Sequence, residues 1–214
     1  MPQIDLAGPA GRLEALWEDP AAPARFAAVV CHPHPLFGGT MHNHATYRLA
    51  KAVRSRGGVS LRFNFRGVGL SQGEHDHGRG EQDDVRAALS LLERERPELP
   101  LLACGFSFGS WMAIEVACAD PRPRGVLAAG LALTLREVAV ESAARCAKPV
   151  AVVQAERDEF GTPDAVGRAL RDSRGPRRLS VVPRATHLCT EDLPTLEHEA
   201  GLALDWLLQE GGIP

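Results

Sequence analysis

Ser107, in the segment GFSFG (Gly105–Gly109), is the residue of this sequence best placed for covalent chemistry. The segment matches G-x-S-x-G, the pattern of a strained turn between a strand and a helix that projects a serine hydroxyl out of a sheet. Bulky side chains two residues before or after the serine would collide in such a turn, and both positions are glycine. Because an apolar run precedes the motif and a helical pattern follows it, we predict that Ser107 is a nucleophile.

A serine hydroxyl is a poor nucleophile at neutral pH and needs a general base, which is most often histidine. In a strand-turn-helix setting the expected chain order is Ser, then Asp or Glu, then His. The histidines after Ser107 are His187, which follows an apolar run, and His198, which lies inside a helical pattern. We predict that His187 is the base and that His198 is a residue of the helix surface.

The acid that orients the base is expected in the segment VAVVQAERDEFGTP, directly after another apolar run. Asp158 is preferred because it lies in a turn closed by glycine and proline, where a short carboxylate side chain can be held in one place. Glu156 and Glu159 remain alternatives, because sequence alone does not place a carboxylate within hydrogen-bond reach of an imidazole.

Acyl transfer from a serine also needs two backbone N–H groups directed at the developing oxyanion. One is expected from Phe108, the residue after the nucleophile. The other is expected from the loop CHPHPLFGG (31–39), in which Pro33 and Pro35 have no N–H. The remaining donors are those of His34, Leu36 and Phe37.

The same region is rich in histidine, and this raises the alternative of a metal site. Four of the chain's eight histidines fall within residues 31–44. If a helix begins near His42, that residue and His44 point to nearly opposite sides of it. No H-x-x-x-H or H-E-x-x-H pattern is found. We therefore expect no metal and no other cofactor.

The elements that must position these residues alternate along the chain. Strands are predicted at 25–32, 59–65, 99–106, 124–133, 148–156 and 177–185, and helices at 40–58, 81–99, 109–120, 162–175 and 193–210, with an antiparallel hairpin at 3–8 and 11–19. Such alternation predicts an α/β fold, a mostly parallel sheet with helices on both faces. Ligands of such sheets bind beyond the carboxyl ends of the strands, where the predicted site residues lie.

The composition is that of one globular domain spanning residues 1–214, with 44% hydrophobic and 24% charged residues among 214. A net charge of −3 provides no basic surface for nucleic acid, and no apolar run is long enough for a membrane span. The N-terminus lacks the pattern of a secretory signal, so a cytoplasmic location is expected. The five cysteines are odd in number and widely spaced, which favours reduced, buried thiols.

Three segments together, HPHPLFGGTMHN, LRFNFRGVGLSQGEHDHGRGEQDD and GFSFG, resemble the small, lidless serine hydrolases of the α/β-hydrolase superfamily, near the dienelactone-hydrolase-like group. The likeness runs from about residue 25 to the end of the chain. Dienelactone hydrolases carry cysteine where this chain has Ser107, and relatives often have aromatic residues where it has Leu188 and Cys189. In the middle segment, Arg66 is expected to pair with an acid such as Glu81 or Asp84.

The resemblance implies the α/β-hydrolase fold, a triad of Ser107, Asp158 and His187, and ester hydrolysis through an acyl-enzyme. Aligned with the family's loop, Leu36 takes the place of the second oxyanion donor. The short stretch between Leu133 and Pro149 leaves room for one helix and no lid domain, so we expect an open site for a small-molecule ester. The alternatives are a non-catalytic binding protein of the same fold and a metal-dependent hydrolase.

Overall fold

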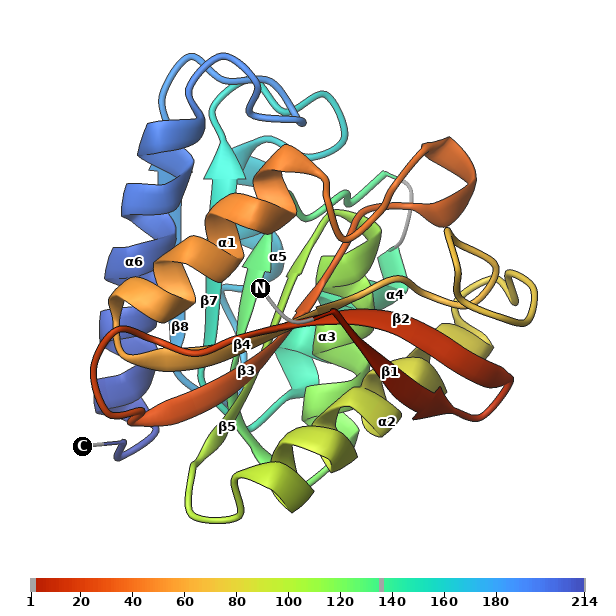
Figure 1. The fold of residues 1–214 in the computed structure, drawn as a ribbon. Helices are drawn as coiled ribbons and strands as arrows, with labels where there is room; N and C mark the ends of the chain where they lie inside the picture. The colour runs from red at the N-terminus through yellow and green to blue at the C-terminus, as the bar shows by residue number, and fades with distance from the viewer. Residues whose placement is uncertain (1–2, 135–136, 214) are drawn as a thin grey trace.

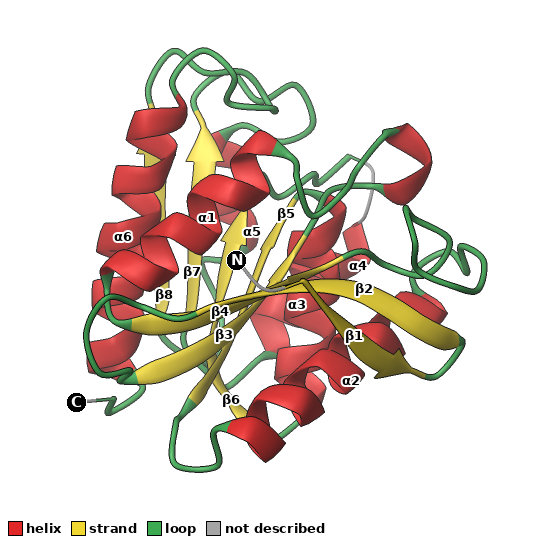
Figure 2. Ribbon diagram, viewed as in Figure 1, coloured by secondary structure: helices red, strands yellow, loops and turns green. Residues whose placement is uncertain are grey.

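An eight-stranded sheet with helices on both faces positions the predicted site (Figures 1 and 2). The computed structural model describes residues 3–134 and 137–213. The strands are β1 (Gln3–Gly8), β2 (Gly11–Glu18), β3 (Phe26–Cys31), β4 (Gly58–Phe63), β5 (Leu101–Phe106), β6 (Pro123–Ala129), β7 (Val150–Ala155) and β8 (Arg177–Val182). The helices are the short 3-10 helix η1 (Pro35–Phe37), α1 (His44–Ser55), α2 (Arg79–Glu95), α3 (Phe108–Ala119), α4 (Glu137–Arg145), α5 (Pro163–Ala169) and α6 (Leu193–Glu210).

The strands lie in the order β1-β2-β4-β3-β5-β6-β7-β8. Strands β1 and β2 form the predicted antiparallel hairpin at one edge, and β2 pairs antiparallel with β4. All other neighbours are parallel. The carboxyl ends of β3, β5, β7 and β8 therefore open on the same edge of the sheet, which is the edge expected to hold a ligand.

Two separate apolar cores fix the helices on the two faces. One core joins one face of the sheet to α2, α3, α4 and α5, through residues such as Val85, Met112 and Val166. The other joins the opposite face to α1 and α6, through residues such as Leu49 and Leu204. Helices α1 (orange) and α6 (blue) lie side by side in Figure 1. Residues of the central strands are buried on both faces, as expected for a parallel sheet covered on both sides.

The predicted elements are found, and several boundaries move for local reasons. Helix α1 begins at His44 because the side chain of Asn43 accepts hydrogen bonds from the N–H groups of Ala45 and Thr46. Strand β6 ends at Ala129 because Gly130 has a φ of 62°, which turns the chain out of the sheet. Helix α5 ends at Ala169, earlier than predicted, whereas α6 has the predicted bounds.

The connection from β6 to β7 carries α4 and no lid domain in the part of it that the structure describes. This agrees with the prediction of one helix between Leu133 and Pro149. No helix within residues 3–134 and 137–213 has the length and apolar character needed to cross a bilayer.

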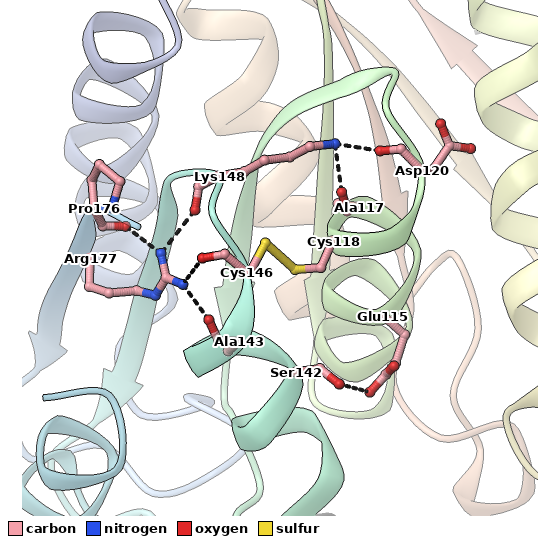
Figure 3. The surroundings of a disulfide bond; sticks show 10 residues. All are labelled: Glu115, Ala117, Cys118, Asp120, Ser142, Ala143, Cys146, Lys148, Pro176 and Arg177. Carbon is pink, nitrogen blue, oxygen red and sulfur yellow. Dashed lines mark hydrogen bonds between the residues drawn. A yellow bond between two sulfur atoms is a disulfide. The ribbon is translucent and has the colours of Figure 1, made fainter. Parts of the chain in front are cut away.

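The expectation of reduced thiols is wrong for two of the five cysteines. Cys118, in α3, forms a disulfide with Cys146, which directly follows α4 (Figure 3). The two are 28 residues apart in the sequence, and only the packing of α3 against α4 brings them together. Disulfides are typical of oxidising compartments, so the cysteines no longer favour the cytoplasm. Cys31, Cys104 and Cys189 are free and buried, as predicted.

Cationic side chains next to the disulfide bind the carbonyl groups at the ends of the two helices (Figure 3). Lys148 donates to the carbonyl of Ala117, at 2.7 Å, and to that of Asp120. Arg177 donates to the carbonyls of Ala143 and Cys146. Because the last carbonyls of a helix lack partners within the helix and carry partial negative charge, these contacts stabilise both helix ends.

Replacing both Cys118 and Cys146 with alanine is expected to lower the free energy of unfolding by about 2–4 kcal/mol, because the disulfide restricts the unfolded chain. Urea unfolding of the oxidised protein, with and without dithiothreitol, measures this difference. The reductant should lower the stability of the unmodified protein and leave the double variant unchanged. Alkylation of the unfolded, unreduced protein at all five cysteines instead of three would show that the disulfide is absent.

Candidate active site

Ser107 lies in a strained turn between β5 and α3. Its backbone has φ of 53° and ψ of −117°, a conformation that costs a residue with a side chain about 1–3 kcal/mol. The turn is held by the Ser107 N–H, which donates to the carbonyl of Ala129 in β6 at 2.8 Å. The Ser107 carbonyl accepts from the N–H of Ser110 at 2.9 Å. The predicted strand-turn-helix placement of this serine is confirmed.

The two glycines of the motif are required by close backbone contacts. A Cβ at position 105 would lie 2.1 Å from the carbonyl oxygen of Gly109. A Cβ at position 109 would lie 2.3 Å from the carbonyl oxygen of Cys31, at the end of β3. Backbone cannot move aside as a flexible side chain can, so any larger residue at either position would displace the turn.

Ser107, His187 and Asp158 come together at the carboxyl edge of the sheet. The hydroxyl of Ser107 lies 2.9 Å from Nε2 of His187, and Nδ1 of the same ring lies 2.9 Å from Oδ2 of Asp158. The Asp158 carboxylate can only accept, so Nδ1 carries the hydrogen and Nε2 is left to accept from the Ser107 hydroxyl. Asp158 and His187 are 1% and 4% exposed, so water competes little for these bonds.

The other two acids considered for this role bind elsewhere. Glu156 accepts from the N–H of Arg184 at 2.6 Å. Glu159 accepts from the backbone N–H of His187 at 3.2 Å and does not reach the imidazole hydrogen that Asp158 binds. His198 is exposed on α6, as predicted.

Gln154, a residue that the sequence analysis missed, holds the Asp158 carboxylate in place. This buried side chain in β7 donates to Oδ2 of Asp158 at 2.8 Å and to the carbonyl of Gly161 at 2.7 Å. Its Oε1 accepts from the N–H of Leu131 at 2.9 Å. Asp158 also accepts from the N–H of Phe160 at 2.9 Å. A glutamine inside the otherwise apolar run VAVVQA was the available signal, because buried amides need partners.

A cavity of about 650 Å³ opens over Ser107. It is lined mainly by aromatic and aliphatic side chains, which include Phe37, Phe108, Trp111, Leu131, Phe160 and Leu188. Phe37 and Leu188 are also strongly exposed at 84% and 52%. The cavity is large enough for a small organic molecule, and the serine hydroxyl lies in its wall.

The loop from 31 to 39 lies against this cavity, but Leu36 does not meet the expectation for an oxyanion donor. Its N–H donates to Nδ1 of His34 at 3.2 Å, its side chain is 65% exposed, and the described residues that line the cavity do not include it. The N–H of Phe37 is used in the same turn, on the carbonyl of His34 at 3.1 Å. His34 itself lines the cavity together with Ser107 and Phe108. His34, the second alternative, stays a prediction for this donor.

His32 is a structural residue between two strands. Its ring is fully buried, with Nδ1 2.6 Å from the carbonyl of Pro33 and Nε2 accepting from the N–H of Phe65 at 3.1 Å. These bonds require the neutral ring with its hydrogen on Nδ1. Burial lowers the pKa of His32 to about 4, since charging the ring there would cost solvation.

The prediction that His42 and His44 point to opposite sides of a helix rests on a helix start that the structure does not show. Both line a second, smaller cavity of about 370 Å³, together with Leu16, Tyr47 and Arg62. The helix begins only at His44, so the helical spacing used in the prediction does not apply to His42. Within the described ranges, no three His, Cys, Asp or Glu side chains are grouped closely enough to hold a metal ion.

The segment after β4 is fixed by two buried acids. Arg66 forms a bidentate pair with Asp84, and the shortest N–O distance is 2.8 Å. Asp84 is one of the two acids predicted to pair with Arg66. Glu81 accepts from the N–H groups of Asp76 and Gly78, both at 2.8 Å, and pairs with His75 at 2.7 Å. This ties the loop to the start of α2, beside the aromatic wall of the main cavity.

Comparison with known proteins agrees with this architecture. Over residues 28–191, well over half of the chain, the sequence matches the family described as the alpha/beta hydrolase domain. The chain belongs to the α/β-hydrolase superfamily. Membership of this superfamily supports a hydrolase activity, whereas the closer likeness to dienelactone hydrolases stays a prediction.

Solved structures of similar α/β-hydrolases cover nearly the whole chain. An alpha-beta serine hydrolase homologue from Coxiella burnetii is 31% identical, with a TM-score of 0.88 over 95% of this chain and 97% of its own. A serine hydrolase without a lid from Xanthomonas campestris is 31% identical, with a TM-score of 0.84 over 96% and 94%. An uncharacterized protein from Rickettsia prowazekii (strain Madrid E) is 38% identical over 168 residues, 78% of this chain and 71% of that protein.

The buried His32 makes a pH-dependent contribution to stability. The folded-state pKa, about 4, is below the ordinary value of 6.5, so between these values the unfolded chain binds more protons than the folded one. Stability falls as the pH drops from 6.5 toward 4, and this group accounts for about 2 kcal/mol between pH 7 and pH 5.

A His32→Gln variant keeps an acceptor for the Phe65 N–H without a titrating ring, so its stability should change less between pH 7 and pH 5. Urea unfolding at the two pH values measures the difference, and His198→Gln serves as the exposed control. Equal pH dependence in His32→Gln and the unmodified protein would rule out this role.

Proposed function

We propose that this α/β-hydrolase is a serine carboxylester hydrolase that works through an acyl-enzyme. The observation that carries the proposal is the continuous chain of hydrogen bonds from Asp158 through His187 to Ser107, with 2.9 Å at each step. Side chains with these roles need such contacts to exchange the serine proton. The strained, cavity-facing position of Ser107 supports the same proposal.

In the first half-reaction the Ser107 oxygen attacks the ester carbonyl while Nε2 of His187 takes the hydroxyl proton. The imidazolium keeps its Nδ1–H on Asp158, whose negative charge stabilises it. The tetrahedral intermediate then collapses, the alcohol leaves with the proton from Nε2, and the acyl group stays on Ser107. In the second half-reaction water repeats these steps and releases the acid.

The oxyanion is proposed to bind the backbone N–H groups of Phe108 and His34. Phe108 is the first residue of α3, so its N–H has no carbonyl one helical turn earlier to bind. The positive end of the helix dipole also points at this place. His34 is proposed because it lines the cavity together with Ser107 and Phe108.

The proposed substrate is a small-molecule ester with an apolar portion. The cavity of about 650 Å³ and its aromatic wall support this choice. A binding protein of the same fold without turnover is the alternative, but such a protein has no need of a strained serine joined to a buried His–Asp pair.

Labelling with a fluorophosphonate probe is expected to modify Ser107, because the probe reacts with a serine that has an adjacent base. Peptide mapping identifies the modified residue. Replacing Ser107 with alanine should abolish labelling and lower kcat for a short ester by at least about 10⁴-fold.

His187→Gln should lower kcat by a similar factor, whereas His198→Gln, the matched control on the surface of α6, should keep the unmodified rate. Labelling elsewhere, or ester hydrolysis that survives in Ser107→Ala and stops with a chelator, would support a metal-dependent hydrolase. An unlabelled protein that hydrolyses no short ester would support the binding protein.

A further inference from the structure

We propose that Glu159 makes this active site select uncharged and cationic esters over anionic ones. This inference rests on the proposed esterase function and names the substrate class of the same site. It is carried by the position of the Glu159 carboxylate at the cavity, beside the base, and by the kinds of side chain that surround it.

The wall of the cavity offers no counter-charge to an anionic substrate. Among the described residues that line it, none is lysine or arginine, and Glu159 is the one carboxylic acid. The other polar side chains there are those of His34, Asn43, Ser107 and His187. A carboxylate or phosphate group on a substrate would lose water on entering without gaining an ion pair.

Glu159 is held in place and is not a freely moving surface acid. Its Oε2 accepts from the backbone N–H of His187 at 3.2 Å, and the ring of that same residue binds Ser107. Its neighbour Asp158 binds the other side of the ring. The negative charge of Glu159 therefore lies at the wall of the cavity, against the backbone of His187.

The surrounding loops do not neutralise this charge inside the cavity. Glu191, four residues after His187, adds a second carboxylate, which accepts from the hydroxyl of Thr186 at 2.6 Å. Arg157 and Arg184 lie in the same two loops, but neither lines the cavity. Glu159 is exposed, so water screens its field. At a few ångströms from a charged group of the substrate, it is expected to change the rate of hydrolysis by about tenfold.

Methyl esters matched in length test the proposal. Methyl hexanoate is neutral, monomethyl adipate replaces its terminal methyl group with a carboxylate, and methyl ε-aminocaproate carries an ammonium group. We expect the unmodified enzyme to hydrolyse the neutral ester with a kcat/KM at least about tenfold above that of the adipate monoester. The cationic ester should also be a better substrate than the adipate monoester.

The ratio of neutral to anionic kcat/KM is the readout in the variants. Glu159→Gln keeps an oxygen to accept from His187 and removes the charge, so the ratio should narrow by about three- to tenfold. Glu156→Gln, the same change on the same loop at an acid that does not line the cavity, is the control and should keep the ratio of the unmodified enzyme. Raising NaCl from about 10 mM to about 0.5 M should narrow the ratio in the unmodified enzyme, because salt screens charge and leaves shape unaffected.

An unchanged ratio in Glu159→Gln, or a preference of the unmodified enzyme for the adipate monoester, would overturn the proposal while leaving the esterase function intact. A ratio that does not respond to salt would assign the selection to shape. If the unmodified enzyme hydrolyses none of the three esters and Ser107 is not labelled by a fluorophosphonate, the proposed function itself fails, and this inference fails with it.

Discussion

The close contact of three backbone segments around Ser107 is the constraint on which the rest of the site depends. Helix α3 starts immediately after β5, and the carbonyl at the end of β3 touches its first turn at Gly109. The strained backbone of Ser107 persists because the parallel strands on either side and the buried helix fix both ends of the turn. Packing of the strands and of α3 thus offsets the backbone strain that places Ser107 at the cavity.

The second requirement concerns the buried carboxylate of Asp158. A charged group shielded from water is stable only when hydrogen bonds within the protein replace those to water. Asp158 meets this requirement with Gln154, the N–H of Phe160 and His187. Gln154 in turn binds the backbone at Leu131 and Gly161, so the loops after β6 and β7 are joined through one amide. The position of the imidazole therefore depends on Gln154, which does not line the cavity, and a poor partner at this position would leave Asp158 free to turn away from the ring.

Sequence patterns could predict the order of the elements and the residues that meet at the candidate site, because both depend on local signals. The apolar runs, the turn at Gly105–Gly109 and the chain order of Ser107, Asp158 and His187 are of this kind. The rest depends on contacts between distant segments. The Cys118–Cys146 disulfide needs the packing of α3 on α4, and the choice between His34 and Leu36 needs the path of a loop in which three residues other than proline carry an N–H. Gln154 was missed because the pattern of an apolar strand does not show which buried polar atoms a side chain of that strand contacts.

The histidines of the loop after β3 have a physical explanation that involves no metal. His32 bridges the ends of β3 and β4, and its neutral ring both donates and accepts. His34 is the N-cap of the short helix η1, and its ring accepts from the N–H of Leu36. A histidine ring is suited to both tasks, because each of its nitrogens can serve a different backbone group. These side chains fix the backbone of a loop that lines the cavity beside Ser107, so a histidine-rich segment is explained by its own backbone contacts.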